Sequence, residues 1–291
     1  IIGKNEGRCR SLFKELMQVL QKAGISEGDN VYIASDVTLL LCEAFKHGVK
    51  TMKARNEYLN ELINTFQQAV GNKGTLLFPI FSWDFCRGKA FNINESLGEV
   101  GSLNNWILQN RPDFVRTRHP LYSFLVWGQN APLLAALDNI DAWGKDSPFA
   151  YLHYHGGKML LFNVSLQRGF TFMHYVEQSV KVPYRYTKAF SGDYIDAEGR
   201  KNKRVYNMYV RDLSINSEEY LPEDFLLSSG AMWEYKIGGQ SLGIIDLGKA
   251  YDIVADNLLN NNGCYCYKFT DYKIDWSKGA THEDDFSNRL S

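Results

Sequence analysis

The chain has 291 residues, of which 45% are hydrophobic and 22% are charged, a composition typical of a globular protein with a substantial core. Its formal net charge of −1 excludes the global positive field with which proteins attract nucleic acid or anionic lipid. No run of about 18 apolar residues occurs, so the sequence predicts no membrane-spanning helix.

The first part of the chain alternates between helix-like and strand-like segments. Apolar residues recur at spacings of three and four over residues 10–24 and 54–70, which predicts two amphipathic helices. A short apolar segment follows each helix, at 31–34 and at 75–78, and both are typical of buried strands. This alternation favours an α/β fold, with a central mixed, largely parallel sheet covered by helices in α/β/α layers.

The later part continues the same pattern. A strand over 159–164 leads through the loop 165–169 into a helix, and open α/β sheets place their sites at such turns. We see no internal repeat or linker and expect one domain over 1–291, with a substrate-side region over about 184–240 and a polar C-terminal tail over about 277–291. The other expected elements are a helix over 100–109, strands over 123–127, 204–211 and 243–246, and a helix near 219–229.

Cysteine and histidine spacing predicts neither a disulfide framework nor a metal site. The five cysteines are odd in number, are scattered and form no C-x-x-C pair. His153 and His155 would point to opposite sides of an extended chain, and no third ligand is obvious, so we expect no metal. The first residues lack the apolar core of a signal peptide, so the expected location is a reducing cytoplasm.

His174 and Glu177 are the most informative residues, because they lie three positions apart in the segment 171–184. On a helix, positions i and i+3 share one face, so the carboxylate can reach the imidazole. A carboxylate there fixes the tautomer of the imidazole and stabilises its protonated form, as a general base near neutral pH requires. A surface His–Glu contact without function has the same spacing, so the pair alone leaves both interpretations open.

A series of motifs, taken in order along residues 10–190, resembles the aminoglycoside 3-N-acetyltransferase family, also called the antibiotic N-acetyltransferase family. Their common order and spacing carry the resemblance, which implies a fold unlike that of the GNAT acetyltransferases. The motifs lie at 74–79 (GTLLFP), 81–83 (FSW), 100–103 (VGSL), 115–120 (VRTRHP, with Ser123 and Gly128), 146–149 (DSPF) and 171–184 (TFMHYVEQSVKVPY).

The resemblance implies an acetyl-CoA-dependent N-acetyltransferase in which His174 is the general base and Glu177 its orienting carboxylate. A substrate amine is mostly ammonium at neutral pH and must lose a proton before it can attack a thioester. No Gly-x-Ser-x-Gly or other nucleophile motif occurs, so direct attack by the amine in a ternary complex is favoured over an acyl-enzyme.

Two segments would contact coenzyme A by the same resemblance. The loop of Ser35, Asp36 and Val37 matches a His-Ser-Ser loop of the family, with Ala34 in place of the His and Asp36 in place of a Ser. Asp36 could equally cap a helix. The second segment could bring arginines to phosphates, or could be a solvated basic turn with a packed histidine. Its candidate residues are Arg116, Thr117, His119 and Ser123.

Asp84, Arg211 and Asp212 are the candidates for contact with the acceptor amine. Asp84 follows Trp83 where the resemblance places an acidic residue against a cationic substrate, although it could also cap the loop. Arg211 departs from the family, because a cation there disfavours a polycationic aminoglycoside unless Asp212 neutralises it. Arg211 would suit a phosphate-bearing substrate, such as a nucleotide-linked amino sugar.

The sequence therefore predicts an acyltransferase that acetylates a primary amine of an amino sugar. An aminoglycoside, as in antibiotic resistance, is the first substrate candidate. A nucleotide-linked amino sugar of surface-polysaccharide biosynthesis is the second. A third possibility is a family member that binds coenzyme A or sugar without turnover. Acetyl-CoA is the expected co-substrate, a small amino sugar is the expected partner, and neither a metal nor nucleic acid is expected.

Overall fold

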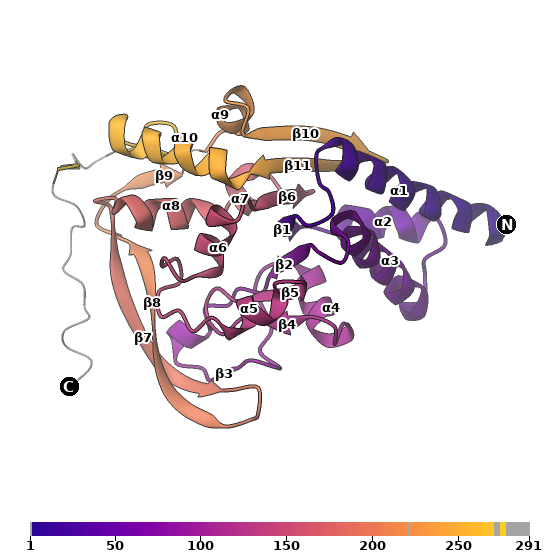
Figure 1. The fold of residues 1–291 in the computed structure, drawn as a ribbon, viewed down its shortest axis with the longest axis horizontal. Coiled ribbons are helices and arrows are strands. Elements are labelled where there is room, and N and C mark those ends of the chain that lie inside the picture. The colour runs from indigo at the N-terminus through magenta and orange to yellow at the C-terminus, as the bar shows by residue number, and fades with distance from the viewer. Residues whose placement is uncertain (1, 220, 271–273, 278–291) are drawn as a thin grey trace.

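The computed structural model describes residues 2–219, 221–270 and 274–277. A seven-stranded sheet lies at its centre, with the strand order β10-β11-β6-β1-β2-β5-β4 (Figure 1). The tail expected over 277–291 lies outside the described residues, apart from Ser277. The bounds of the seven strands, in sheet order, are Met232–Ile237, Gln240–Asp246, Lys158–Phe162, Asn30–Ser35, Thr75–Pro79, Phe124–Gly128 and Val115–Arg116.

The sheet is mixed, as predicted, and its parallel pairing is confined to three inner strands. β6 and β2 run parallel to β1, whereas β10, β11, β5 and β4 each run antiparallel to a neighbour. The outer strands thus differ from the largely parallel arrangement expected. β10 and β11 are joined by Gly238 and Gly239, both with positive φ, and a turn this short permits only antiparallel pairing.

Helices cover both faces of the sheet and form the predicted α/β/α layers. Along β1, Val31 and Ile33 face one apolar core while Tyr32 and Ala34 face the other. The first core lies under α1 (Ile2–Lys22), α2 (Thr38–Lys46), α3 (Met52–Val70) and α4 (Ser102–Asn110). The second lies under α5 (Ala131–Ala136), α6 (Pro148–Tyr154), α7 (Leu166–Gly169), α8 (Phe172–Val180) and α10 (Leu247–Asn260).

The long helices agree with the apolar periodicity, and the short elements agree less well. α1 and α3 confirm the two helices predicted first, and Thr51 caps α3 by accepting a hydrogen bond of 3.1 Å from the Ala54 N–H. The sequence does not predict α2, because its nine residues, TLLLCEAFK, show no clear one-sided apolar pattern. The helix expected near 219–229 is the shorter α9 (Glu223–Ser228), which follows β9 (Ser217–Glu219).

A long hairpin of β7 (Arg185–Ile195) and β8 (Lys201–Arg211) curves away from the central sheet at the lower left of Figure 1. It lies within the region expected to face the substrate. Short β3 (Phe91–Asn92) pairs with β7 and ties the segment after β2 to the hairpin. The short helix η1 (Phe85–Arg87) packs against β7, where a Cβ on Gly192 would lie only 2.8 Å from the Phe85 ring. β12 (Tyr267–Phe269) pairs with β9.

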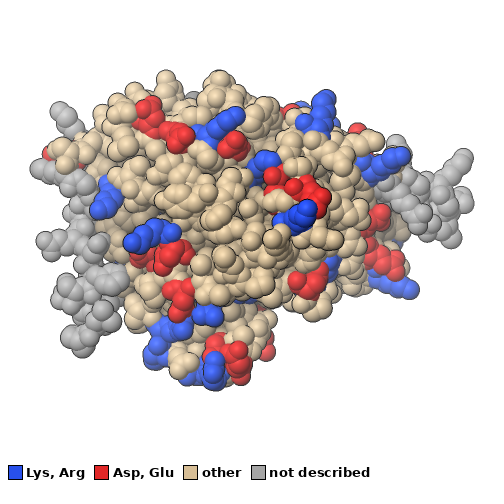
Figure 2. All heavy atoms as spheres, in the orientation of Figure 1, with Lys and Arg blue, Asp and Glu red and all other residues tan. Residues whose placement is uncertain are grey.

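Surface charge is evenly mixed on the face that Figure 2 shows. Lys and Arg side chains lie among Asp and Glu side chains, in keeping with the net charge of −1. Both signs gather at the lower end, where Figure 1 places the turn of the β7–β8 hairpin. This face therefore offers no extended surface of a single sign.

Candidate active site

α8 presents His174 and Glu177 on one side, one helical turn apart. The His174 Nδ1 lies 2.7 Å from Glu177 Oε2, a length typical of a charge-assisted hydrogen bond. The His174 side chain is 24% exposed, whereas that of Glu177 is completely buried. The carboxylate thus lies behind the imidazole, and the imidazole remains open to solvent.

Buried Glu177 keeps its negative charge because three groups stabilise it. The Tyr184 hydroxyl donates a hydrogen bond of 2.8 Å to Oε1, and the Arg185 Nε lies 2.8 Å from Oε2. Within the described part of the chain the Arg185 Nε has no well-aligned acceptor, so its attraction to Glu177 is mainly that between the two charges. Burial alone raises the pKa of Glu177, but Arg185, His174 and Tyr184 outweigh it and lower the pKa to about 2.

An ionised Glu177 fixes the tautomer of His174. A carboxylate only accepts hydrogen bonds, so Nδ1 carries the proton and Nε2 keeps a lone pair. Arg185 Nη2 donates a hydrogen bond of 3.3 Å to the Tyr267 hydroxyl. It also lies 3.1 Å from His174 Nδ1, but in this tautomer both nitrogens are donors, so the contact is not a hydrogen bond. The arrangement leaves Nε2 as the atom that can accept a proton from a substrate.

A row of aromatic side chains leads from the loop after β2 to His174. The Trp143 ring lies 5.0 Å from the His174 ring and 4.5 Å from the Tyr122 ring. The Trp83 Nε1 donates a hydrogen bond of 3.3 Å to the Tyr122 hydroxyl. Such rings can pack against the apolar faces of a sugar, and sequence reasoning did not identify Tyr122 or Trp143 as part of the site.

A cavity of about 560 Å³ opens at the carboxyl ends of β1 and β2. Its walls include Ser35, Gly101, Asn104 and Thr171. Among the described residues, Ser35 Oγ and Asn104 Oδ1 are buried polar atoms without a hydrogen-bond partner. Buried polar groups are normally paired, so two such atoms in one cavity indicate a ligand that pairs with them.

The shape of the cavity depends on Gly101, and its wall at Thr171 lies close to His174. Gly101 has a φ of 67°, and a Cβ on it would lie 2.5 Å from the Asn104 amide nitrogen. Thr171 lies one helical turn before His174, whose N–H donates a hydrogen bond of 3.0 Å to the Thr171 carbonyl. A ligand that fills the cavity therefore reaches the turn of backbone that carries the imidazole.

A second hollow, of about 670 Å³, lies between α2 and α3 and shares Thr38 and Ser102 with the first cavity. Lys50 and Arg55 are exposed at its margin. Lys46 also lines it, and its Nζ lies 2.7 Å from Glu43. The hollow therefore offers positive charge beside the cavity that leads to His174.

The loop after β1 positions its three candidate residues differently. Ser35 lines the cavity with a free hydroxyl, as described above. Asp36 also lines the cavity, but its Oδ1 accepts a hydrogen bond of 2.8 Å from the Thr38 N–H at the start of α2. Val37 is buried in the core. Contact of these residues with coenzyme A stays a prediction, and its geometric support is strongest for Ser35.

Arg116, Thr117 and Ser123 are buried and make hydrogen bonds within the protein. Arg116 donates from Nε to Ser123 Oγ at 3.0 Å and from Nη1 to the Ser96 carbonyl at 2.5 Å. Thr117 Oγ1 accepts from the Phe124 N–H at 2.8 Å. Their polar atoms thus tie the β4–β5 turn to the segment after β3, and the expected contact with coenzyme A finds no support in this geometry.

His119 is likewise an interior residue, with no exposed surface. Its Nε2 donates to the Ile140 carbonyl at 3.2 Å, while Nδ1 accepts from the N–H groups of Leu121 and Tyr122, each at 3.3 Å. Burial lowers the pKa of His119 to about 4. This geometry supports the structural interpretation of His119 and not the one that places it beside a cofactor.

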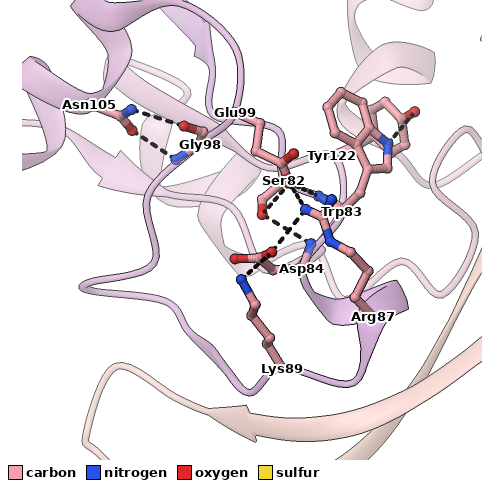
Figure 3. A network of polar contacts seen from close by, with 9 residues as sticks. All are labelled: Ser82, Trp83, Asp84, Arg87, Lys89, Gly98, Glu99, Asn105 and Tyr122. Atoms are coloured by element: carbon pink, nitrogen blue, oxygen red, sulfur yellow. Dashed lines mark hydrogen bonds and ion pairs between the residues drawn. The ribbon is translucent and has the colours of Figure 1, made fainter.

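Figure 3 shows Asp84 within a cluster of charged side chains. Arg87 Nη2 lies 2.8 Å from Asp84 Oδ1 and also contacts Glu99 Oε1, while Lys89 Nζ lies 3.0 Å from Asp84. Glu99 Oε1 also accepts a hydrogen bond of 2.8 Å from the Trp83 N–H. Lys89 and Arg87 lower the pKa of Asp84, although partial burial opposes this. Asp84 is therefore ionised and already paired with two cations.

Arg211 and Asp212 lie at the end of β8. Arg211 is the cross-strand neighbour of Arg185 and is exposed, with Nη1 donating a hydrogen bond of 3.4 Å to Ser217 Oγ. Asp212 is buried, and its Oδ1 accepts hydrogen bonds from the N–H and the hydroxyl of Ser214 at 2.9 and 2.7 Å. Asp212 thus stabilises a turn, while the predicted substrate contact of Arg211 remains open to test.

The described residues contain no group of three or more His, Cys, Asp or Glu side chains placed to hold a metal ion. None of the helices within the described ranges combines the length and the apolar character that crossing a bilayer requires.

Known proteins of one family resemble this chain in sequence and fold. Aminoglycoside N(3)-acetyltransferase VII of Streptomyces paromomycinus is 33% identical over 183 residues, and the chain spans 62% of the length of this relative. The structure titled AAC-IIIb binary with CoASH has a TM-score of 0.67 at 19% identity, with 90% of this chain and 98% of that chain covered. The YokD protein of Bacillus subtilis has a TM-score of 0.66 at 18% identity, with 87% and 95% covered.

The structural likenesses are at low identity and show a shared fold. The sequence match is more decisive, because residues 48–258 fit the family described as aminoglycoside 3-N-acetyltransferase, and this range is most of the chain. It includes the cavity-lining Gly101, Asn104 and Thr171 as well as the His174–Glu177 pair. The chain belongs to the aminoglycoside 3-N-acetyltransferase family.

Proposed function

We propose that this chain is an acetyl-CoA-dependent N-acetyltransferase that acetylates a primary amine of an amino sugar. The observation that carries the proposal is the position of His174, backed by buried Glu177, on the helix that borders a cavity with two unpaired polar atoms. The name of the Streptomyces relative supports this activity. So do the fold neighbours, whose solved structures hold CoASH, sisomicin or apramycin.

Acetyl-CoA is the substrate that fits the two connected hollows. Ser35 Oγ and Asn104 Oδ1 would pair with the amide groups of the pantetheine arm. Lys50 and Arg55, beyond the shared Thr38 and Ser102, would attract the phosphates of the nucleotide end. The first hollow would bring the thioester to the Thr171 side of α8, within reach of the acceptor amine.

His174 would act as the general base of the transfer. Its Nε2 takes a proton from the attacking amine, the amine nitrogen bonds to the thioester carbonyl carbon, and the C–S bond breaks. The proton then passes from the imidazolium to the departing sulfur, so free coenzyme A and an acetamide result. Glu177 stabilises the transient imidazolium at Nδ1, and general base catalysis of this kind contributes about 10²–10⁴ in rate.

An aminoglycoside is the first acceptor candidate, because the relatives carry that name. A nucleotide-linked amino sugar is the second, favoured by exposed Arg211 beside the strand that holds Arg185. No disulfide joins Cys42, Cys86 or Cys264 to another described residue, as we would expect for action in a reducing cytoplasm where acetyl-CoA is made. Binding without turnover is the remaining alternative.

Release of free coenzyme A from acetyl-CoA, measured across aminoglycosides and nucleotide-linked amino sugars, tests the activity. His174→Ala should lower kcat at least about a hundredfold, because the base is lost, while the Kd for coenzyme A changes little. His155→Ala is the matched control, since that ring stacks on Tyr151 away from the pair. Equal activity of the two variants would refute the mechanism, and coenzyme A binding without release on any amine would favour the binding-only alternative.

A further inference from the structure

We propose that Arg87 and Lys89 influence the acceptor specificity of this enzyme by occupying Asp84 and Glu99, so that the loop gives a polycationic amine no electrostatic advantage over an amino sugar with a single amine. The inference rests on the proposed acetyltransferase function and adds to it the charge class of the acceptor. It follows from the position of the four charged residues and from the partners they already have.

The four charges lie where the cavity meets the aromatic row. Glu99 lines the cavity, and its Oε1 binds the backbone N–H of Trp83, the first ring of the row that ends at His174. Ser82 Oγ donates a further hydrogen bond of 3.3 Å to the same Glu99 oxygen. An amine that approaches along Trp83 therefore meets the field of this cluster.

Arg87 is the central member of the cluster. A single nitrogen, Nη2, contacts both Asp84 Oδ1 and Glu99 Oε1, and Lys89 adds a second cation on Asp84 (Figure 3). Two cations thus match two carboxylates, and the cluster as a whole is neutral. Without Arg87 and Lys89, the same loop would present two adjacent carboxylates beside the cavity.

This neutrality determines what the loop can attract. A polyamine gains binding energy from each uncompensated carboxylate that it meets, whereas a sugar with one ammonium group gains less. The side chains of Asp84 and Glu99 are 40% and 37% exposed, so a diffusing polycation can reach them but must compete with intramolecular partners. The cluster therefore removes the electrostatic advantage of a polycationic acceptor over a monoamine.

The test compares kanamycin, a polyamine, with glucosamine, a monoamine, as acceptors for wild type and for the Arg87→Gln/Lys89→Gln double variant. The ratio of kcat/KM for kanamycin to that for glucosamine should rise about tenfold in the double variant, since two carboxylates are exposed. The gain should shrink at high salt, because the new attraction is screened. Arg87→Gln alone should produce the larger part of the effect, because Arg87 contacts both carboxylates.

Arg200→Gln is the matched control, since Arg200 also joins two carboxylates, Asp196 and Glu198, but at the turn of the β7–β8 hairpin. An unchanged or lower ratio in the double variant would overturn the inference. Calorimetric titration of kanamycin into both proteins supplies a readout without turnover, and tighter binding by the variant alone is expected. If no aminoglycoside or nucleotide-linked amino sugar is acetylated, the proposed function fails; if kanamycin and glucosamine are both acetylated and the ratio does not change, only the specificity inference fails.

Discussion

The side chains of Glu177 and Arg185 form an ion pair of 2.8 Å, in which the former is 0% and the latter 10% exposed. Removing one partner of a buried pair leaves an uncompensated charge in the interior, whereas replacing both with apolar groups is often tolerated. Because Glu177 also binds His174, the same carboxylate contributes to both the stability of the fold and the orientation of the candidate base.

Glu177→Gln should therefore damage stability and turnover together. The neutral amide leaves Arg185 buried without a counter-charge, so the free energy of unfolding should fall by about 3–5 kcal/mol. The kcat should fall about a hundredfold, because the amide no longer stabilises the imidazolium of His174. Denaturant unfolding and steady-state kinetics at neutral pH measure the two effects.

The Glu177→Gln/Arg185→Met double variant separates them. It should recover most of the lost stability, since no unpaired charge remains, but it should stay slow. Recovery of turnover along with stability would mean that Glu177 matters only as the counter-charge of Arg185.

Ser35→Ala and Ser123→Ala should have opposite effects on stability and on the KM for acetyl-CoA, although both serines are buried. Ser35 Oγ has no hydrogen-bond partner among the residues that the structure describes, so its loss should leave the melting temperature nearly unchanged and raise the KM for acetyl-CoA about fivefold. Ser123 Oγ bonds to Arg116 and to the Ile80 carbonyl, so its loss should cost about 1–3 kcal/mol of stability and leave that KM unchanged. An equal rise in the KM for acetyl-CoA in both variants would support contact between Ser123 and coenzyme A.

Lys50→Gln and Arg55→Gln test the hollow between α2 and α3. Each should raise the KM for acetyl-CoA about threefold at low salt, because an exposed cation near a phosphate contributes up to about 1 kcal/mol. Acetyl-pantetheine, which lacks the nucleotide and its phosphates, should be used equally well by wild type and variants. Lys73→Gln is the control, an exposed lysine paired with Glu27. An equal rise in KM with acetyl-pantetheine would show that Lys50 and Arg55 do not bind the phosphates of coenzyme A.

The sequence predicts the local part of the site, because the His174–Glu177 contact needs only one helical turn. Tyr184 and Arg185, the other partners of Glu177, reach the carboxylate only because the chain reverses direction after α8. Lys181 ends α8 with a φ of 56°, and the Val182 N–H then bonds back to the Glu177 carbonyl. This turn returns Tyr184 to the carboxylate, and no periodicity in the sequence predicts that return.

The parts of the site that remained unpredicted depend on contacts between distant segments. Asn104 lies on a helix that the sequence predicts. Its oxygen lines the cavity only because the fold packs α4 beside the end of β1, and the sequence does not show this packing. Arg116 has the sequence context of a basic surface turn, yet it is buried, with its guanidinium 4.7 Å from the Phe91 ring. Burial of an arginine cannot be predicted from neighbouring residues, because its hydrogen-bond partners come from other parts of the chain.

His119 should make the protein lose stability as pH falls from about 6.5 to about 4. Its pKa is lowered by burial to about 4 in the fold, against 6.5 in the unfolded chain. Its stabilising effect is therefore complete above pH 6.5 and is lost as pH falls, because the unfolded chain takes up the proton first. The loss should reach about 3 kcal/mol.

His119→Gln isolates this effect, since the amide can still donate and accept hydrogen bonds but does not titrate in that range. Urea unfolding at a series of pH values should show a steeper decline for wild type than for the variant between pH 6.5 and 4.5. His153, whose pKa burial also lowers, contributes equally to both proteins and cancels in the difference. Glu177 contributes only below pH 4.5, as its own pKa is lowered to about 2. Parallel curves above pH 4.5 would show that the pKa of His119 is not lowered in the folded protein, contrary to its burial.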